Sequence, residues 1–353
     1  MSKKLTIKEI AKEAGVSVST VSRVLNNHPS IRPEKRRLVQ EIIDRENFQP
    51  SMLARGMISN QTKNIAVLLP DINNPYFTDL INQIDLSFRK LGYSLLLLNT
   101  ATAGHSKSDQ PVSQEKASFA TIIEKNVDGV LILGGEIDKV SPKPEYLKAL
   151  NQLNQRVPVV IIGQPNPEVE AVFLPRALRQ GTQMALQHLL ALGYEDIGFI
   201  GGEPGVTITE ERLKAFQESL ALYREVHEEW IHLSDFYSES GYQSMSALLA
   251  EERHPRAVVA INDKVALGGI RALNDVGLTC PDDVAIVSCD AFPDGEYYSP
   301  RLTAINQNNQ LLGAEAAALL LERITGKPTT PQKIYQPELI IRESCGVQLR
   351  RKQ

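Results

Sequence analysis

The chain has 353 residues, of which 42% are hydrophobic and 23% are charged, a composition typical of a soluble globular protein with two or three domains. It has no run of about 18 apolar residues and no secretory signal pattern in its first ten residues, so it is predicted to be a cytoplasmic protein without contact to a membrane. Its three cysteines, an odd number without close spacing, argue against a disulfide framework or a cysteine zinc site.

The net charge of −4 hides an asymmetry between the two ends of the chain. Residues 1–63 hold 12 Lys and Arg against 6 Asp and Glu, a net charge of +6, whereas the other 290 residues carry −10. On charge alone, the basic segment is equally consistent with solvated helix faces and with a surface that binds phosphate.

Three short helices are predicted in the basic segment. Thr6-Ile7-Lys8-Glu9 forms a capping-box pattern, and Gly15 is a helix stop. Ser17 can cap a second helix almost at once, and Pro33 opens a third, so the first two helices have helix-turn-helix spacing. The residues predicted to close the three-helix core are Ile7, Ile10, Ala11, Ala14, Val21, Val24, Leu25, Leu38, Ile42, Ile43 and Phe48.

In a helix-turn-helix unit the second helix enters the major groove, and its early outward residues meet base edges. Arg23 is the candidate for a bidentate contact with guanine. Val18 can pack on a thymine methyl group, and Ser19 and Ser22 can bond a base or a phosphate. The alternative is that this outward face is merely solvated.

The segment LTIKEIAKEAGVSVSTVSRVLNN, residues 5–27, resembles the DNA-binding head of the lactose/galactose-repressor (LacI/GalR) family. The resemblance continues through residues 50–57 and into the body at NIAVLLPDINNPYF, GGEPG with ERLKAF, DFYSESGY, AINDKVALG and PDDVAIVSCD. It implies a dimeric repressor whose hinge helices insert an apolar side chain into the minor groove of a pseudo-palindromic operator. The DNA-binding residues expected from pattern and resemblance together are Thr6, Ser17, Val18, Ser19, Thr20, Ser22, Arg23, Asn26, Leu53, Ala54, Arg55 and Met57.

The implied domains are a helix-turn-helix head at 1–49, a hinge helix and linker at 50–63, and an effector-binding and dimerisation body at 64–353. The apolar side chain that the hinge inserts into the minor groove is usually Leu in the family, and Met57 occupies that position here. Gly56 stands where a small Ser is usual. Arg32 replaces the Ser that usually caps the third helix.

The body alternates short apolar runs with helical segments, which predicts α/β subdomains with parallel sheets and crossover helices. The predicted strands are 65–69, 94–98, 129–133 and 159–162 in one lobe, and 197–201, 257–261 and 284–288 in the other. The predicted fold is therefore a small all-α head followed by two doubly wound parallel-sheet subdomains. The resemblance implies that they are of periplasmic-binding-protein type, with chain crossovers near 163, 290 and 325.

Ligands of such sheets bind at the carboxyl ends of the strands, in the cleft between the lobes. The resemblance implies that Asp290, Arg212 and Asn262 contact a small-molecule effector, and a sugar fits carboxylate, guanidinium, amide and aromatic partners. The remaining candidate effector-binding residues are Tyr76, Phe77, Phe236 and Gln307. The alternative to an effector-binding role for Arg212 and Asp290 is a purely structural salt bridge. Phe236 and Tyr76 are equally consistent with packing in the hydrophobic core.

Several departures from the family pattern fall near the expected cleft. Gly163-Gln164 follows the strand 159–162 where the family commonly has a sugar-binding Asp, and Pro175-Arg176 replaces an Asp-Asn pair. Arg176 and Arg179 would suit a phosphorylated sugar. The segment 101–116 is longer than usual and is predicted to be a flexible surface loop.

An enzyme is the main alternative from another class. The sequence contains no phosphate-binding loop, HExxH, GxSxG or EF-hand pattern, and its six histidines lack metal-ligand spacing. We therefore predict no enzymatic activity, no cofactor and no metal. A sugar-binding component without DNA function is a second alternative, against which the basic helix-turn-helix argues. The C-terminal segment lacks the leucine heptads of a tetramer, so a homodimer on double-stranded operator DNA is expected.

Overall fold

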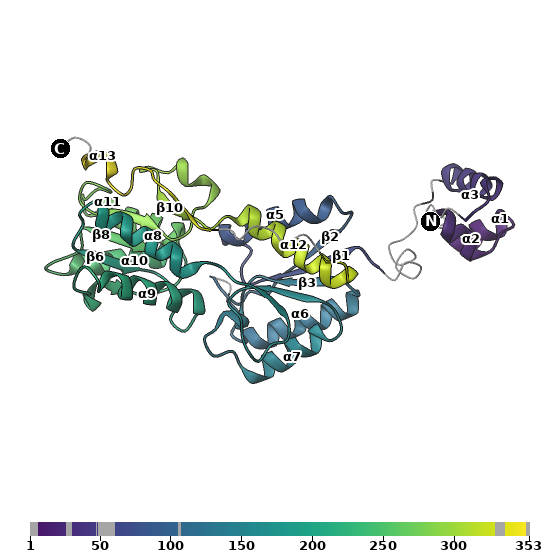
Figure 1. The fold of residues 1–353 in the computed structure, drawn as a ribbon, viewed down its shortest axis with the longest axis horizontal. Helices are drawn as coiled ribbons and strands as arrows, with labels where there is room; N and C mark the ends of the chain where they lie inside the picture. Colours follow the sequence, from purple (N-terminus) through teal and green to yellow (C-terminus); the bar gives the residue numbers. More distant parts are fainter. Residues whose placement is uncertain are drawn as a thin grey trace. The chain divides into compact units, whose positions relative to one another are not determined.

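The computed structural model describes residues 6–25, 30–46, 48, 61–104, 107–328 and 336–350. The chain divides into two compact units, Met1–Lys63 and Asn64–Gln353 (Figure 1). The two units share no hydrophobic cluster among the described residues. Within the described ranges, no helix is long and apolar enough to cross a membrane.

In the residues of the first unit that the structure describes, three helices form the head. They are α1 (Ile7–Glu13), α2 (Val18–Leu25) and α3 (Pro33–Arg45). The predicted capping box is present, since Thr6 Oγ1 accepts from Glu9 N at 3.3 Å and Glu9 Oε2 accepts from Thr6 N at 2.8 Å. Ser17 Oγ accepts from Thr20 N at 3.2 Å and so caps α2.

The head core consists of Ile10, Ala11, Ala14, Val21, Val24, Val39, Ile42 and Ile43, with Ile7, Leu25 and Phe48 packed at its edge. The prediction for Leu38 was wrong, because its side chain is 46% exposed. Val39 is fully buried in its place, since i, i+3 and i+4 spacing puts Val39, Ile42 and Ile43 on one face of α3.

The second unit, the body, has two sheets within its described ranges. The first has the strand order β2-β1-β3-β4-β5, and all of its strands are parallel. The second has the order β11-β10-β9-β8-β6-β7, and only β11 runs antiparallel to its neighbour in the described part of the sheet. The strands are β1 (Asn64–Leu69), β2 (Ser94–Asn99), β3 (Gly129–Ile132), β4 (Val159–Ile162), β5 (Val172–Leu174), β6 (Ile197–Ile200), β7 (Ile231–His232), β8 (Ala257–Ala260), β9 (Ala285–Ser288), β10 (Thr303–Asn306) and β11 (Glu338–Ile340).

Helices cover both sheets. They are α5 (Pro75–Arg89), α6 (Pro111–Lys125), α7 (Pro144–Asn154), α8 (Leu178–Ala191), α9 (Thr207–Leu220), α10 (Ser238–Ala250), α11 (Asp263–Asp275), α12 (Asn309–Thr325) and α13 (Val347–Arg350), with single turns at η1 (Glu136–Asp138), η2 (Glu228–Trp230) and η3 (Pro293–Glu296). In the first lobe, Ile65, Val67 and Leu69 of β1 pack with α5 and α12, whereas Ala66 and Leu68 pack with α6 and α7 (Figure 1). The period of two along β1 thus sends alternate side chains into two cores. In the second lobe, α8 packs with α9, and α10 packs with α11.

The chain crosses between the lobes later than predicted at two of the three positions. β5 pairs with β4 in the first sheet, so the first crossing follows Leu174 and not residue 163. β10 pairs with β9, so the second crossing follows Asn306 and not residue 290. β5 has only three residues, and β10 begins and ends with the polar residues Thr303 and Asn306, so neither strand shows a clear hydrophobic pattern. α12 then packs on the first lobe and ends at Thr325, before the chain returns to β11.

Local signals place the residues at the strand ends. Asn74 Oδ1 caps α5 by accepting from Tyr76 N at 3.1 Å, and Pro75 occupies the first turn of that helix. Asn262 Oδ1 caps α11 by accepting from Val265 N at 2.9 Å. The prediction of a loop over 101–116 was wrong for residues 111–116, because Pro111 begins α6.

Candidate nucleic-acid interface and ligand cavity

The outward face of α2 carries three of the predicted DNA-contacting residues. Val18 is 44% exposed, and Ser19 and Arg23 are exposed beside it on the same helix. Ser22 is buried, so its hydroxyl offers little surface to a base or a phosphate. Thr20 is half-buried.

Thr6 and Ser17 cap the two helices of the motif. The Ser17 hydroxyl also lies 2.8 Å from Ser19 Oγ and 2.9 Å from Thr20 Oγ1, a small hydroxyl cluster at the start of α2. Such a cluster orients the first turn of the helix and leaves backbone N–H groups available to a phosphate. The other predicted contacts, Asn26, Leu53, Ala54, Arg55 and Met57, lie outside the described residues.

A cavity of about 130 Å³ lies in the body, and both lobes contribute to its wall. Pro70 and Gly163 follow β1 and β4 of the first lobe, and Asn262 and Asp290 follow β8 and β9 of the second. An engineered protein cavity of roughly 150 Å³ admits benzene, so this cavity accepts a ligand with a single ring. Its apolar wall includes Tyr76, Phe77, Leu133, Ile162, Leu178 and Phe236.

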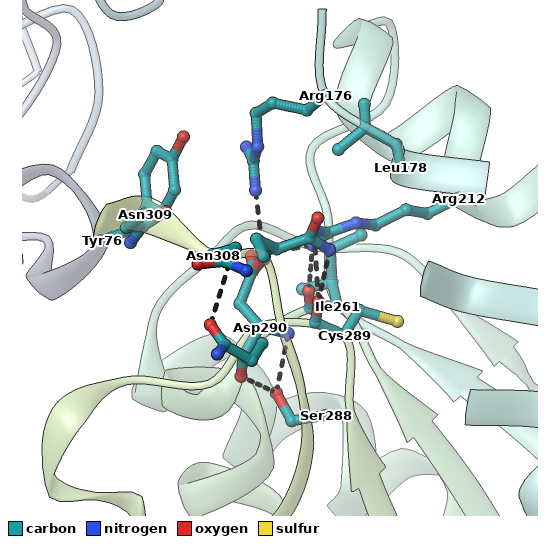
Figure 2. Close-up of polar contacts among 12 residues, drawn as sticks. Tyr76, Arg176, Leu178, Arg212, Ile261, Ser288, Cys289, Asp290, Asn308 and Asn309 are labelled. Carbon is teal, nitrogen blue, oxygen red and sulfur yellow. Dashed lines mark hydrogen bonds and ion pairs between the residues drawn. The ribbon is translucent and has the colours of Figure 1, made fainter. Parts of the chain in front are cut away.

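Asp290 is held by a bidentate ion pair with Arg212. Arg212 Nη1 donates to Asp290 Oδ2 at 2.9 Å and Arg212 Nη2 donates to Asp290 Oδ1 at 2.7 Å (Figure 2). The Arg212 side chain is fully buried, and it also donates to the carbonyls of Ile261 and Cys289. Burial alone would lower the pKa of Arg212, but Asp290 beside it raises the pKa above its ordinary value. Asp290 lines the cavity, and Arg212 lies behind Asp290 and orients it.

A second guanidinium reaches Asp290 from the other side. Arg176 Nη2 donates to Asp290 Oδ1 at 3.1 Å, and the Arg176 guanidinium carbon lies 4.3 Å from the centre of the Tyr76 ring (Figure 2). Arg179, three residues along, instead pairs with Glu218 and Glu211, and its side chain is 38% exposed. Of these two arginines, only Arg176 contributes to the cavity wall.

The other predicted effector-binding residues fall into two groups. Tyr76, Phe77, Phe236 and Asn262 line the cavity with Asp290. The Asn262 amide is engaged by the fold, since its Nδ2 donates to Phe236 O at 3.0 Å while its oxygen caps α11. Gln307 does not line the cavity, and its Nε2 donates to Cys289 O at 3.1 Å.

Buried acids lie at the first-lobe side of the cavity. Glu115 Oε1 accepts from Glu136 N at 2.8 Å, and Glu136 Oε1 accepts from Lys143 N at 2.9 Å. Burial raises the pKa of Glu115 to about 7 and the pKa of Asp138 to about 6, and Arg176 partly offsets the shift at Asp138. Both carboxyls therefore titrate near neutral pH.

This cluster predicts that stability falls as pH rises. Because the folded-state pKa of Glu115 lies above its unfolded value, its contribution is fully present below about pH 4.5 and is lost as pH rises through 7. Glu115→Gln should raise the stability at pH 8 by on the order of 2 kcal/mol and change it little at pH 5. Thermal melts at both pH values measure this, with the exposed Glu124→Gln as control. An equal effect of Glu115→Gln at pH 5 and pH 8 would contradict the assignment.

Polar contacts join the lobes at the edge of the cavity. Lys107 and Lys139 of the first lobe donate to Glu203 Oε1 of the second at 2.9 and 3.0 Å. Tyr237 OH donates to Asp71 Oδ2 at 2.6 Å. Burial raises the pKa of Glu203, but the two lysines outweigh it and hold the pKa below its usual value. The described conformation thus has its lobes in direct polar contact.

Removing the Glu203 carboxylate should loosen this contact only modestly. The three side chains are about one-third exposed, so solvent screens the pairs, and Glu203→Gln should cost about 1 kcal/mol or less. Thermal melts in low and high salt measure the effect, which should shrink as salt is added. If Glu203→Gln lowers the stability equally in low and high salt, these ion pairs contribute nothing to the stability of the protein.

Residues 6–51 match the family described as bacterial regulatory proteins, lacI family, and residues 186–345 match the periplasmic binding protein-like domain. The chain is 34% identical to the HTH-type transcriptional repressor PurR of Actinobacillus pleuropneumoniae serotype 3 (strain JL03), across 96% of this chain and 98% of that protein. It is 33% identical to the repressor of the same name from Pasteurella multocida (strain Pm70), across 98% and 99%. The chain belongs to the LacI family.

Solved structures of repressors share the fold of this chain. The lac repressor dimer bound to operator and the anti-inducer ONPF superposes on this LacI-family chain with a TM-score of 0.83, at 24% identity over 97% of this chain and 99% of that one. The regulator CelR in complex with cellobiose gives a TM-score of 0.67, at 28% identity over 96% and 99%. The predicted family and fold class are confirmed, and the protein is a DNA-binding transcriptional repressor and not an enzyme.

Sequence reasoning missed several residues of the cavity wall in this LacI-family chain. Glu136 and Asp138 come from η1, a turn that no hydrophobic pattern marks, and Lys139 follows it directly. Glu203 lies in the GGEPG segment, which the sequence analysis singled out only for its family resemblance. The glycine pair 134–135, which follows β3 with positive φ at both residues, is the signal that could have drawn attention to the adjacent η1.

Proposed function

We propose that the operator affinity of this repressor is controlled by a small-molecule effector, a sugar or sugar derivative, bound in the cavity between the lobes. The observation that supports this most strongly is Asp290, a buried carboxylate fixed by Arg212 at the wall of a cavity that also presents the Tyr76 ring. Carboxylates bind ring hydroxyls, and aromatic faces pack against the C–H face of a sugar. The similarity to CelR, whose structure contains cellobiose, also favours this ligand class.

We propose that the protein acts as a homodimer on a pseudo-palindromic operator. The first lobe leaves leucines exposed on α5, just after it, on β2 and on α12, namely Leu86 (53%), Leu91 (51%), Leu97 (40%) and Leu311 (39%). Exposed apolar side chains on neighbouring elements are typical of an interface between subunits. A two-fold dimer presents one head to each half-site.

In this proposal the domains are the head at 1–49, the hinge at 50–63 and the body at 64–353, in the cytoplasm with the DNA. Val18, Ser19 and Arg23 read the major groove, with Thr6, Ser17, Thr20 and Asn26 toward the phosphates. Leu53, Ala54, Arg55 and Met57 of the hinge contact the minor groove. A ligand that changes how the lobes close would alter the pairing of the first lobes in the dimer and so the spacing of the hinges.

A gel-shift selection followed by a ligand screen tests this proposal. A pool of random duplexes should yield a pseudo-palindromic site that the full chain binds with nanomolar affinity at moderate salt. A thermal-shift screen of sugars, sugar phosphates and nucleosides should then find a ligand that also changes that affinity. Absence of any preferred duplex would overturn the DNA assignment, and a cavity ligand without effect on the operator would overturn effector control.

A further inference from the structure

Arg176 places a cation directly in the wall of the cavity. Its side chain is only 9% exposed, and its guanidinium lies over the Tyr76 ring and beside the Asp290 carboxylate (Figure 2). A guanidinium stays charged at any pH that a protein meets. The cavity therefore offers a permanent positive charge next to an aromatic face.

The hydrogen bonding of Arg176 is incomplete. Both Asp290 oxygens already accept shorter bonds from Arg212, at 2.7 and 2.9 Å against 3.1 Å for Arg176. Arg176 Nε is buried and has no acceptor among the described residues. Arg212 Nε shares this condition, but Arg212 lies behind the cavity and not in its wall. A buried N–H group without an acceptor is unfavourable. A ligand oxygen that enters the cavity beside Arg176 can therefore accept a hydrogen bond for which the protein supplies no acceptor.

Asp138 is the second polar group built into this wall. A Cβ atom on Gly134 would lie 2.9 Å from Asp138 Oδ2, and a Cβ atom on Gly163 would lie 3.0 Å from Asp138 Oδ1. The glycines after β3 and β4 therefore leave the space that this carboxylate fills. Burial raises the pKa of Asp138 to about 6 and the charge of Arg176 offsets part of this rise, so the carboxyl is ionised above that pH. The carboxylate is thus an acceptor for hydroxyl or amino groups of a ligand.

We propose that the effector presents a carboxylate or phosphate to Arg176 and a hydroxyl or amino group to Asp138, which describes an acidic sugar derivative such as a sugar phosphate. Arg212 and Asp290 neutralise each other. The remaining charges in the wall are the cation of Arg176 and the carboxylate of Asp138, which interact with each other. A ligand complements them when it has an anionic group for Arg176 and a hydrogen-bond donor for Asp138. This inference rests on the proposed function, because it assigns the chemistry of the same effector cavity.

Inorganic phosphate is the minimal probe of the Arg176 half of the site. At constant ionic strength, phosphate at about 20 times its Kd should raise the melting temperature of the full-length protein by about 4 °C, with saturation. Arg176→Gln should lose this rise, whereas Arg179→Gln, on the surface of α8, should keep it. Acetate in a parallel titration distinguishes a carboxylate site from a phosphate site. No saturable rise with either anion, or an equal rise in Arg176→Gln, would overturn the proposal.

Glycerol 3-phosphate, which adds hydroxyl donors to the phosphate, probes the Asp138 half. Wild type should bind it about tenfold more tightly than inorganic phosphate, and Asp138→Ala should remove this preference without weakening phosphate itself. Equal preference in wild type and Asp138→Ala would contradict the role of Asp138. Operator binding of the same samples is measured separately: anion binding without any change in operator affinity would leave the site standing while effector control fails.

Discussion

Asp290→Ala should lower the stability of the body by about 3–5 kcal/mol and abolish the response to the effector. The Arg212 side chain is fully buried, and the substitution removes its only carboxylate partner among the described residues. Two backbone carbonyls would remain as acceptors, but they cannot neutralise the guanidinium. The loss therefore reflects an uncompensated buried charge more than the absence of one contact.

Chemical denaturation of wild type and Asp290→Ala measures this loss. Asp290→Asn is the informative companion, because it retains an oxygen acceptor and removes only the charge, so it should keep most of the loss if the uncompensated charge of Arg212 is its cause. Asp282→Ala, an exposed acid in the same lobe, should change the stability by less than about 0.5 kcal/mol. An Asp290→Ala protein as stable as wild type would show that Arg212 finds another partner, and a normal effector response in Asp290→Asn would remove Asp290 from the effector site.

Arg23→Ala should weaken binding to the preferred operator by roughly 5- to 150-fold, which corresponds to about 1–3 kcal/mol. Arg23 is exposed on α2, on the same outward face as Val18 and Ser19, and it is the residue of that face able to bond guanine with two donors. Because the lost contact is to a base, the discrimination between operator and random duplex should fall with it.

Lys35→Ala provides the matched comparison for Arg23→Ala. Lys35 is exposed on α3. If Lys35 contacts only phosphate, its loss should weaken binding to all duplexes alike and reduce the salt dependence of binding by about one unit of slope. Fluorescence anisotropy with operator and with random duplex at several salt concentrations separates the two patterns. Unchanged selectivity in Arg23→Ala would show that this side chain lies on the surface without reading bases.

The elements with strong local signals were predictable from the sequence. The capping box at Thr6 and Glu9 and the Ser17 cap define the starts of α1 and α2, and the seven predicted strands each carry a mainly apolar run. The position of Asp290 after β9 follows from the same reasoning, since parallel strands in doubly wound sheets present their carboxyl ends to one cleft.

The positions that were not predictable depend on contacts between distant parts of the chain. β5 has only three residues, β10 has polar residues at both ends, and the pairing of each depends on its neighbours β9 and β4 from earlier in the chain. Arg176 and Arg179 are close in sequence, yet one turns into the cavity and the other to the surface. That difference depends on where the chain crosses between lobes, which no local pattern encodes.

In the proposed function, the cavity of the body controls what the head binds. The most direct measurement is the Kd of the selected operator for wild type and Asp290→Asn, with and without a ligand that stabilises the wild-type body. We expect the ligand to change the wild-type Kd by roughly 5- to 150-fold, the usual range of allosteric coupling, and to leave the Asp290→Asn Kd unchanged. A ligand that stabilises the body while the wild-type operator Kd stays constant would contradict the account.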